Sequence, residues 1–273
     1  MTPRAIADRL AAIPGVLAVA LGGSRARGTA TPTSDVDLGV CYDPARPPAR
    51  DQLNALAREL DDTHPVAAVT PFGAWGPWIN GGAWLTIDGE HVDWLFRDLA
   101  RVRRVVAECR TGRPDIAYQP GHPHAFVSAM YLGEIDCCVP LVDPDGHLAT
   151  LKALVRPYPP LLRTALVARF LDEARFSLDG AAKAAPRADV VYVAGCLFRT
   201  VSALVQVLFA ANDRYCLNEK GALAELSGFA RIPADFSSTA TRILGAAGDD
   251  AAALTASVRT ARTLVDAVRS TIA

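Results

Sequence analysis

The sequence has little net charge and no strongly basic segment. Its 28 Lys and Arg residues are balanced by 29 Asp and Glu residues, which gives a formal net charge of −1. Proteins that bind nucleic acid without sequence preference usually carry an excess of Lys and Arg or a basic surface stripe, because neutralising the phosphate charges supplies much of their affinity. The composition therefore argues against general nucleic-acid binding, and the arginine-rich run at 101–104 is expected to be a solvated helix face.

Zinc-like cysteine spacings and an export signal are also missing. None of the six cysteines forms a C-x-x-C pair, and His122 and His124 have no third ligand at a suitable spacing. The first residues lack the charged start and apolar run that direct export. We therefore expect a reduced, cytoplasmic protein whose cysteines serve mostly as small core residues.

One stretch is apolar on nearly every helical face. Residues 189–211 are long enough to span a membrane. Arg199 and Gln206 fall inside this stretch, however, and no basic flanking loops support a span. The interpretation favoured here is the central helix of a bundle, with no membrane partner.

The most informative segment joins a small-residue turn to two carboxylates. Leu21-Gly22-Gly23-Ser24 follows a predicted strand at 16–21, and Ser34-Asp35-Val36-Asp37 leads into a second one at 36–41. Strand residues at i and i+2 share a face, so Asp35 and Asp37 would project together. Two carboxylates about 4 Å apart repel by roughly 4 kcal/mol at an effective dielectric near 20. A divalent cation between them would offset this repulsion, although a lone Asp-x-Asp pair also occurs as a solvated strand end.

The turn between the two strands has the chemistry of a phosphate site. Gly22 and Gly23 can adopt backbone angles that are closed to other residues, and they would let a phosphate approach the main chain. Backbone N–H groups at a turn and helix start bind anions, and the Ser24 hydroxyl adds a donor. Mg²⁺ prefers a few carboxylates together with phosphate oxygens and water, and paired metals stabilise both oxygens of an in-line displacement.

This combination resembles the nucleotidyltransferases of the polymerase-β superfamily over about the first hundred residues. In pattern it is most similar to the minimal nucleotidyltransferases and to the antibiotic nucleotidyltransferases that act on aminoglycosides and lincosamides. The resemblance implies Mg²⁺-dependent transfer of a nucleoside monophosphate, AMP from ATP or the equivalent from another NTP, to a hydroxyl of a small-molecule acceptor. It implies metal ligation by Asp35 and Asp37, and nucleotide binding by Gly22, Gly23, Ser24, Arg27 and Ser34.

The related families place a third acid on a neighbouring strand, and Asp93 matches that position. Two strand-like runs flank a predicted hairpin turn at Asp88-Gly89. In the second run the large apolar residues alternate with polar ones, which puts Asp93 on the opposite face from Trp94. The alternative is a solvated polar face. With the upstream motif present, Asp93 is predicted to be a metal ligand or general base.

The predicted fold class is α+β. A length of 273 residues corresponds to about two domains at roughly 150 residues each. We expect an N-terminal mixed β-sheet nucleotidyltransferase domain with flanking helices over 1–112, and an all-α helical bundle over 113–273 that the resemblance makes the acceptor-binding domain. Apolar periodicity and capping signals predict helices at 3–13, 51–62, 98–110, 126–138, 161–178, 189–211 and 251–272, and a further strand at 66–69.

Two residues outside the motif are further candidates. Lys220 lies in a predicted interhelical turn with Asn218; the resemblance implies that it reaches the β- and γ-phosphates, and the alternative is an ordinary capped turn. Glu134 is a second candidate general base, because antibiotic-modifying relatives place a glutamate near the acceptor hydroxyl.

Other functions remain open on the sequence alone. Minimal nucleotidyltransferases with a similar motif adenylylate a partner toxin, although they usually consist of one domain. A catalytically silent nucleotide-binding module is a third hypothesis, which the presence of all three acids disfavours. A homodimer is compatible with the apolar helical half.

Overall fold

The computed structural model describes residues 1–273, which form two compact units. The first unit comprises Met1–Glu108 and Tyr131–Pro157, and the second comprises Cys109–Met130 and Tyr158–Ala273. The units are interleaved along the chain, whereas the sequence predicts a single boundary after residue 112.

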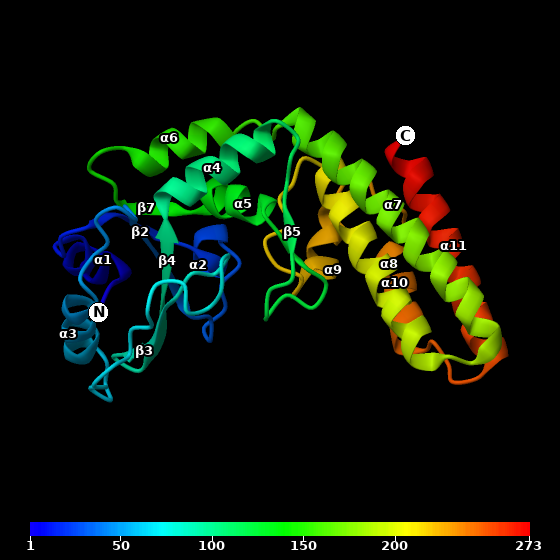
Figure 1. Cartoon of the computed structure of the whole chain (residues 1–273), viewed down its shortest axis with the longest axis horizontal. Coiled ribbons are helices and arrows are strands. Elements are labelled where there is room, and N and C mark those ends of the chain that lie inside the picture. Colours follow the sequence, from blue (N-terminus) through cyan, green and yellow to red (C-terminus); the bar gives the residue numbers. More distant parts are fainter. The chain divides into compact units, whose positions relative to one another are not determined.

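The first unit is built on a five-stranded mixed sheet. Its strands lie in the order β3-β4-β2-β1-β7 (Figure 1). The neighbours β2 and β4 are parallel, and every other neighbouring pair is antiparallel. The bounds are β1 Val16–Leu21, β2 Val36–Tyr42, β3 Gly82–Ile87, β4 Glu90–Asp98 and β7 Val139–Val142. The mixed N-terminal sheet followed by a helical region confirms the predicted α+β class.

Period-2 alternation decides which face of the sheet is buried. On β2 the buried residues Val36, Leu38 and Val40 alternate with the less buried Asp37 and Gly39. The helices α1 (Pro3–Ala11) and α3 (Arg50–Leu60) lie over the apolar face and complete the core (Figure 1). The polar residues of the central strands are therefore left on the opposite face.

The hairpin between β3 and β4 turns at the predicted dipeptide. Asp88 and Gly89 both have positive φ, at 52° and 77°. Positive φ at both central positions matches the twist of the flanking strands, and Gly at the second position adopts it without steric cost. The turn signal in the sequence is thus confirmed.

A late strand returns to the edge of the first sheet. After α4 (Leu99–Arg110) and α5 (Ala129–Cys137), the chain forms β7, which pairs antiparallel with β1, and then α6 (His147–Val155). The strand β7 was not predictable from the sequence, because a four-residue strand containing Pro140 carries almost no periodic signal. This return explains why the two compact units are interleaved.

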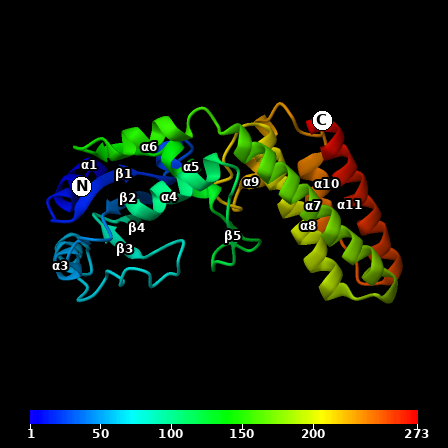
Figure 2. The ribbon, with the colours of Figure 1, turned by 45° about the horizontal axis from the view of Figure 1, so that its top comes forward.

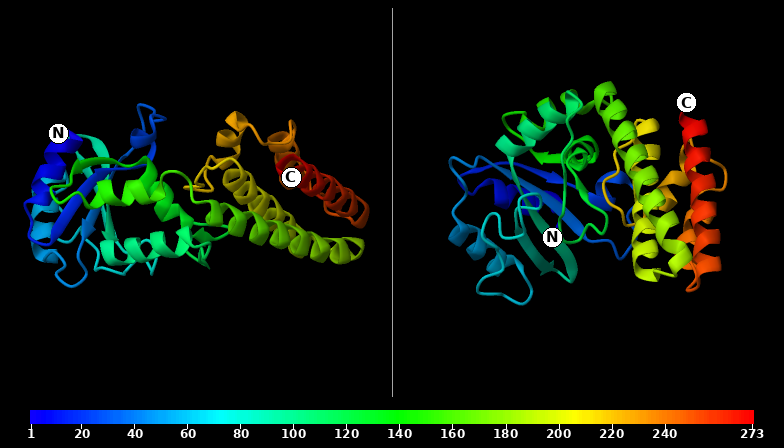
Figure 3. Two further views of the ribbon diagram at one scale, coloured as in Figure 1. Left: turned by 90° about the horizontal axis from the view of Figure 1, so that it is seen from above. Right: turned by 45° about the vertical axis from the view of Figure 1, so that its right-hand side comes forward.

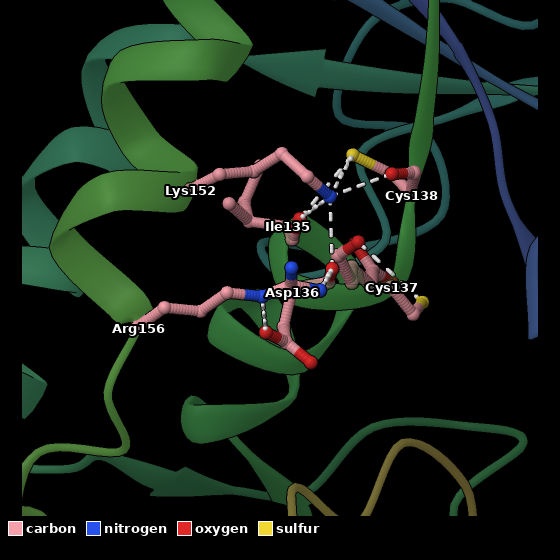
Figure 4. A network of polar contacts seen from close by, with 7 residues as sticks. Ile135, Asp136, Cys137, Cys138, Lys152 and Arg156 are labelled. Carbon is pink, nitrogen blue, oxygen red and sulfur yellow. Dashed lines mark hydrogen bonds and ion pairs between the residues drawn. The ribbon is translucent and has the colours of Figure 1, made fainter.

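The end of α5 is held by a lysine from α6 (Figure 4). The Lys152 ammonium donates hydrogen bonds to the carbonyl oxygens of Ile135, Asp136 and Cys138, at 2.9, 2.8 and 2.6 Å. Arg156, one turn further along, binds Asp136 through its guanidinium. Terminal helix carbonyls lack intrahelical partners, so Lys152 satisfies groups that would otherwise need water.

The second unit is mainly helical. The long helices α7 and α8 form a hairpin joined by a 3₁₀ turn, and α11 packs along both of them (Figures 2 and 3). The window of α8 that is long and apolar enough to cross a membrane is 72% buried inside the unit, in agreement with the predicted central bundle helix. The bounds are β5 Ile116–Ala117, β6 Phe126–Val127, α7 Pro160–Ala184, α8 Val190–Ala211, α9 Ala222–Glu225, α10 Phe236–Gly245 and α11 Ala251–Ile272.

Two local predictions are wrong. Residues 66–69 form no strand: the Val69 N–H donates to the Asn54 side chain at 2.9 Å instead of to a β-ladder. The helix predicted from 126 begins only at Ala129, because Phe126–Val127 pairs with Ile116–Ala117. In both cases a specific long-range contact overrides local propensity.

Replacing Lys152 is expected to destabilise the first unit more than replacing its neighbour in the network. Lys152→Met leaves three carbonyl groups without their charged donor, which costs about 2–3 kcal/mol. Arg156→Met is the matched control, because that side chain is 59% exposed and its ion pair is worth less than about 1 kcal/mol. Urea unfolding of both variants measures the difference, and equal losses would contradict this account of the α5 terminus.

Candidate active site

Asp37 and Asp93 are direct neighbours across the two central strands. The parallel register pairs Asp37 with Asp93, as it pairs the buried Leu38 with Trp94. Both aspartates are half-buried on the face opposite the apolar core. Adjacent strands lie about 4.8 Å apart, so the two carboxylates share one patch. Asp35 is exposed and comes one residue before β2 begins.

The pKa values of these acids show that the carboxylates affect one another. Burial together with the negative charges of Asp37 and Asp35 raises the pKa of Asp93 from 3.8 to about 6. Burial also raises the pKa of Asp37, with further contributions from Asp35 and Glu134, while Arg27 and Arg25 oppose the shift. The patch therefore carries more negative charge than its own arginines neutralise.

The glycine turn lies directly against Asp37. The Gly22 N–H donates to the Asp37 carbonyl at 2.8 Å. A Cβ at Gly23, where φ is +58°, would come within 1.8 Å of the Asp37 carboxylate oxygen Oδ2. Only glycine allows this close approach. The predicted phosphate turn and the predicted metal ligand are thus brought together, at the start of the short helix α2 (Gly23–Arg27).

The remaining motif residues mostly support the loop. The Arg25 guanidinium donates to the carbonyls of Ser34 and Asp35, at 2.9 and 3.2 Å, and holds the entry to β2. The Ser34 hydroxyl accepts from the Thr31 N–H at 2.9 Å and closes the preceding turn. Arg27 is exposed and acts on Asp37 through its charge. Nucleotide binding by Ser34 and Arg27 stays a prediction.

Glu134 is held by an arginine that sequence reasoning missed. Arg97, buried on β4, donates to both carboxylate oxygens of Glu134, at 2.9 and 2.8 Å. Arg97 lies four residues after Asp93 and therefore on the same face of the strand. An arginine on the polar side of an alternating strand was the available signal, but its partner 37 residues away was not readable from spacing.

Lys220, His122 and His124 belong to the second unit. Lys220 is exposed, and its N–H donates to the Asn218 side chain at 2.9 Å, so the predicted capped turn is present. A role for Lys220 toward phosphates stays a prediction. His124 forms an ion pair with Glu173 at 2.8 Å, and Arg199 joins the same carboxylate at 2.7 Å.

Asp37 and Asp93 offer the oxygen ligands that a divalent cation prefers, but they do not form a complete metal site with a third side chain. No group of three His, Cys, Asp or Glu side chains in the structure is arranged to hold a metal ion. Mg²⁺ usually takes only one or two protein carboxylates, and phosphate oxygens and water supply the other ligands. The oxygen donors and the unbalanced negative charge at Asp37 and Asp93 meet that requirement.

Comparison with known proteins supports nucleotide transfer as the general activity. Residues 4–74 match the family model described as a nucleotidyltransferase domain. The matched region contains the glycine turn, Asp35 and Asp37, and it supports nucleotide transfer as the general activity and a transferase as the general class. None of the curated proteins matches the chain. Among solved structures, a nucleotidyltransferase-like protein from Exiguobacterium sibiricum 255-15 is 12% identical, covers 96% of this chain and 73% of its own, and has a TM-score of 0.48.

A methyl group at Gly23 is expected to displace the Asp37 carboxylate. Gly23→Ala adds both left-handed backbone strain and the clash with Oδ2, so we expect weaker Mg²⁺-nucleotide binding and a stability loss of about 1–2 kcal/mol. Gly28→Ala is the matched control: its φ is +70°, but no atom lies within 4 Å of the added methyl. Calorimetric titration with Mg·ATP compares the two, and equal weakening would contradict the role of the contact.

Asp93→Asn is expected to stabilise the protein at neutral pH. The folded state raises the pKa of Asp93 to about 6, so folding binds a proton more tightly, and stability falls as pH rises from about 4 to 6. Removing this charge should raise the free energy of unfolding by about 1 kcal/mol at pH 7.5 after solvent screening, and by much less at pH 4. Thermal unfolding of both proteins across this range tests the sign. A loss of stability at pH 7.5 would contradict it.

Proposed function

We propose that this protein is a Mg²⁺-dependent nucleotidyltransferase that moves a nucleoside monophosphate, most simply AMP from ATP, to a hydroxyl group of a small molecule. The observation that carries the proposal is the alignment of Gly23, Asp37 and Asp93 on neighbouring parts of one sheet face. A phosphate-binding turn, a metal-binding carboxylate and a candidate base are then adjacent, as in-line transfer requires.

The turn supplies the nucleotide end of the proposed site. The backbone amides of Gly23 and Ser24, together with the Ser24 hydroxyl, would bind the triphosphate, with Arg27 as the nearby positive charge. Asp35 and Asp37 would hold Mg²⁺, with Asp93 completing the set. Mg²⁺ bound there would neutralise phosphate charge and stabilise the oxygens of the displacement.

Asp93 is the better candidate for the general base. It pairs with Asp37 across β2 and β4, so its carboxylate would lie beside an acceptor hydroxyl that attacks a nucleotide bound at Asp37. Both carboxylate oxygens of Glu134 accept hydrogen bonds from Arg97, so this carboxylate is already engaged within the protein. We assign proton removal from the acceptor hydroxyl to Asp93 and a positioning role to Glu134. The hydroxyl oxygen then attacks the α-phosphorus, and pyrophosphate leaves.

The acceptor proposed is a hydroxylated small molecule of the aminoglycoside or lincosamide type, and the protein is proposed to act in the cytoplasm. The absence of a basic surplus supports a small acceptor over a nucleic acid. Lys220 is proposed to assist at the triphosphate.

Asp37→Asn is expected to abolish transfer without unfolding the protein. Loss of a charge that stabilises the transition state should lower turnover by at least about 10³-fold. The assay incubates the protein with Mg²⁺, each α-labelled NTP and a panel of aminoglycosides and lincosamides, and follows pyrophosphate release and label transfer. Added Mg²⁺ should also raise the unfolding temperature of the wild-type protein but not of the variant.

Asp88→Asn is the matched control, because Asp88 is an exposed turn acid on the hairpin that carries Asp93. Its turnover should remain near the wild-type value. Near-wild-type turnover of a folded Asp37→Asn protein would refute the mechanism. Label found on a co-purified protein instead of a small molecule would refute the proposed acceptor class while preserving nucleotidyl transfer.

A further inference from the structure

Trp84 lies unusually exposed beside the candidate carboxylates. It is 68% exposed, although its strand neighbours Ala83 and Leu85 are 1% and 3% exposed. Trp84 pairs directly with Asp93 across β3 and β4, so the two side chains stand on the same face. A large exposed aromatic side chain next to functional acids is a mark of a ligand-binding surface.

One face of the exposed Trp84 indole is covered by the indole of Trp75. Trp75 stacks on Trp84 with ring centroids 4.3 Å apart and an interplanar angle of 20°. Gly82 lies on the same face of β3 as Trp84, and a Cβ there would come within 3.0 Å of the Trp75 ring. The same Cβ would also come within 1.8 Å of the Trp94 carbonyl oxygen, so glycine at this position accommodates both the neighbouring strand and the Trp75 ring.

The loop that carries Trp75 is fastened at several points. The Asn80 side chain accepts from the Gly73 N–H and donates to the Tyr42 hydroxyl, both at 2.7 Å. The Gly82 N–H donates to the Thr70 hydroxyl at 2.9 Å, and Tyr131 binds the carbonyl of Trp78. The stacked pair is thus a preorganised surface, which lowers the entropy lost on binding a ring.

The order of the strands places this pair on the acceptor side. Across the sheet, the glycine turn follows β1, Asp37 is on β2, Asp93 on β4 and Trp84 on β3. In an in-line displacement the leaving group and the attacking oxygen lie on opposite sides of the phosphorus. With the phosphates at the turn, the attacking molecule approaches from the side of Asp93 and Trp84.

We propose that Trp84, backed by Trp75, forms the subsite for the acceptor's ring and takes a saturated, hydroxylated ring that carries ammonium groups. The proposal rests on the proposed function and names the acceptor class for that site. The indole face contacts the apolar edge of the ring and attracts a cation, and the neighbouring carboxylates favour positive charge. A neutral polyol ring meets the same indole without the electrostatic gain.

The test uses the full-length protein without nucleotide and two matched cyclohexane polyols. The first probe is 2-deoxystreptamine, which bears two ammonium groups, and the second is neutral myo-inositol. The chain has four tryptophans, so each indole N–H signal can be assigned in ¹⁵N NMR spectra by single Trp→Phe variants. Trp94 is 0% exposed and serves as an internal control for the fold.

We expect 2-deoxystreptamine to shift the Trp84 and Trp75 signals but not that of Trp94, and to bind roughly tenfold more tightly than myo-inositol. Trp84→Ala should weaken this binding by roughly tenfold. Phe176→Ala, which removes an aromatic side chain that is 81% exposed on α7, should leave it unchanged.

Three results would overturn the proposal. The first is that Trp84→Ala binds 2-deoxystreptamine as tightly as the wild-type protein does. The second is that neither polyol shifts the indole N–H signal of Trp84 or Trp75. The third is that Mg·ATP shifts the Trp84 signal and that Trp84→Ala loses ATP binding. The last result would assign the pair to the nucleobase. Mg·ATP binding to the wild-type protein is measured separately, so failure of the proposed function is distinguishable from failure of this subsite.

Discussion

The parallel pairing of β2 with β4 is the constraint on which the candidate site depends. Each strand buries alternate apolar residues against α1 and α3, and a slip by one residue would turn every one of these side chains to the wrong face. The apolar core therefore fixes the register, and the register sets Asp37 beside Asp93 on the other face. Burial of the two carboxylates, together with their mutual repulsion, raises both pKa values and opposes folding at neutral pH, and the stability of the core offsets this cost. Unfavourable electrostatics maintained by a well-packed scaffold is typical of functional sites.

The conformation of the glycine turn and the position of the Asp37 carboxylate also depend on each other. Gly23 lies so close to the Asp37 carboxylate that the turn can only take this path without a side chain. Arg25 fastens the segment leading to Asp35 from the opposite side, through two backbone carbonyls. A change in the turn would therefore move the Asp37 carboxylate, and a change at that carboxylate would move the backbone amides of the turn. Gly23 and Arg25 therefore both fix the position of the segment that carries Asp35 and Asp37.

Features with a local periodic cause were predictable from the sequence, and features made by distant contacts were not. Alternation predicts β2 and β4 and the face of Asp93, positive-φ turn residues predict the hairpin at Asp88-Gly89, and helical spacing predicts α7, α8 and α11. The edge strand β7 was missed because a four-residue segment has no period to detect. The Arg97–Glu134 pair and the Trp75–Trp84 stack were missed because each joins segments whose proximity only the folded sheet determines. The strand expected at 66–69 failed for the same reason, since Asn54 takes the N–H that a ladder would use.

The candidate site residues follow one another across the sheet in a different order from their order along the chain. Along the chain the turn and Asp37 come first, then the tryptophans, then Asp93; across the sheet the order is turn, Asp37, Asp93 and Trp84. The crossover that places β4 beside β2 puts Asp93 between Asp37 and Trp84 across the sheet. Arg97, further along β4, engages both carboxylate oxygens of Glu134. The proposed base therefore lies between the residue proposed to bind the metal and the tryptophan proposed to bind the acceptor ring, because the sheet topology puts it there.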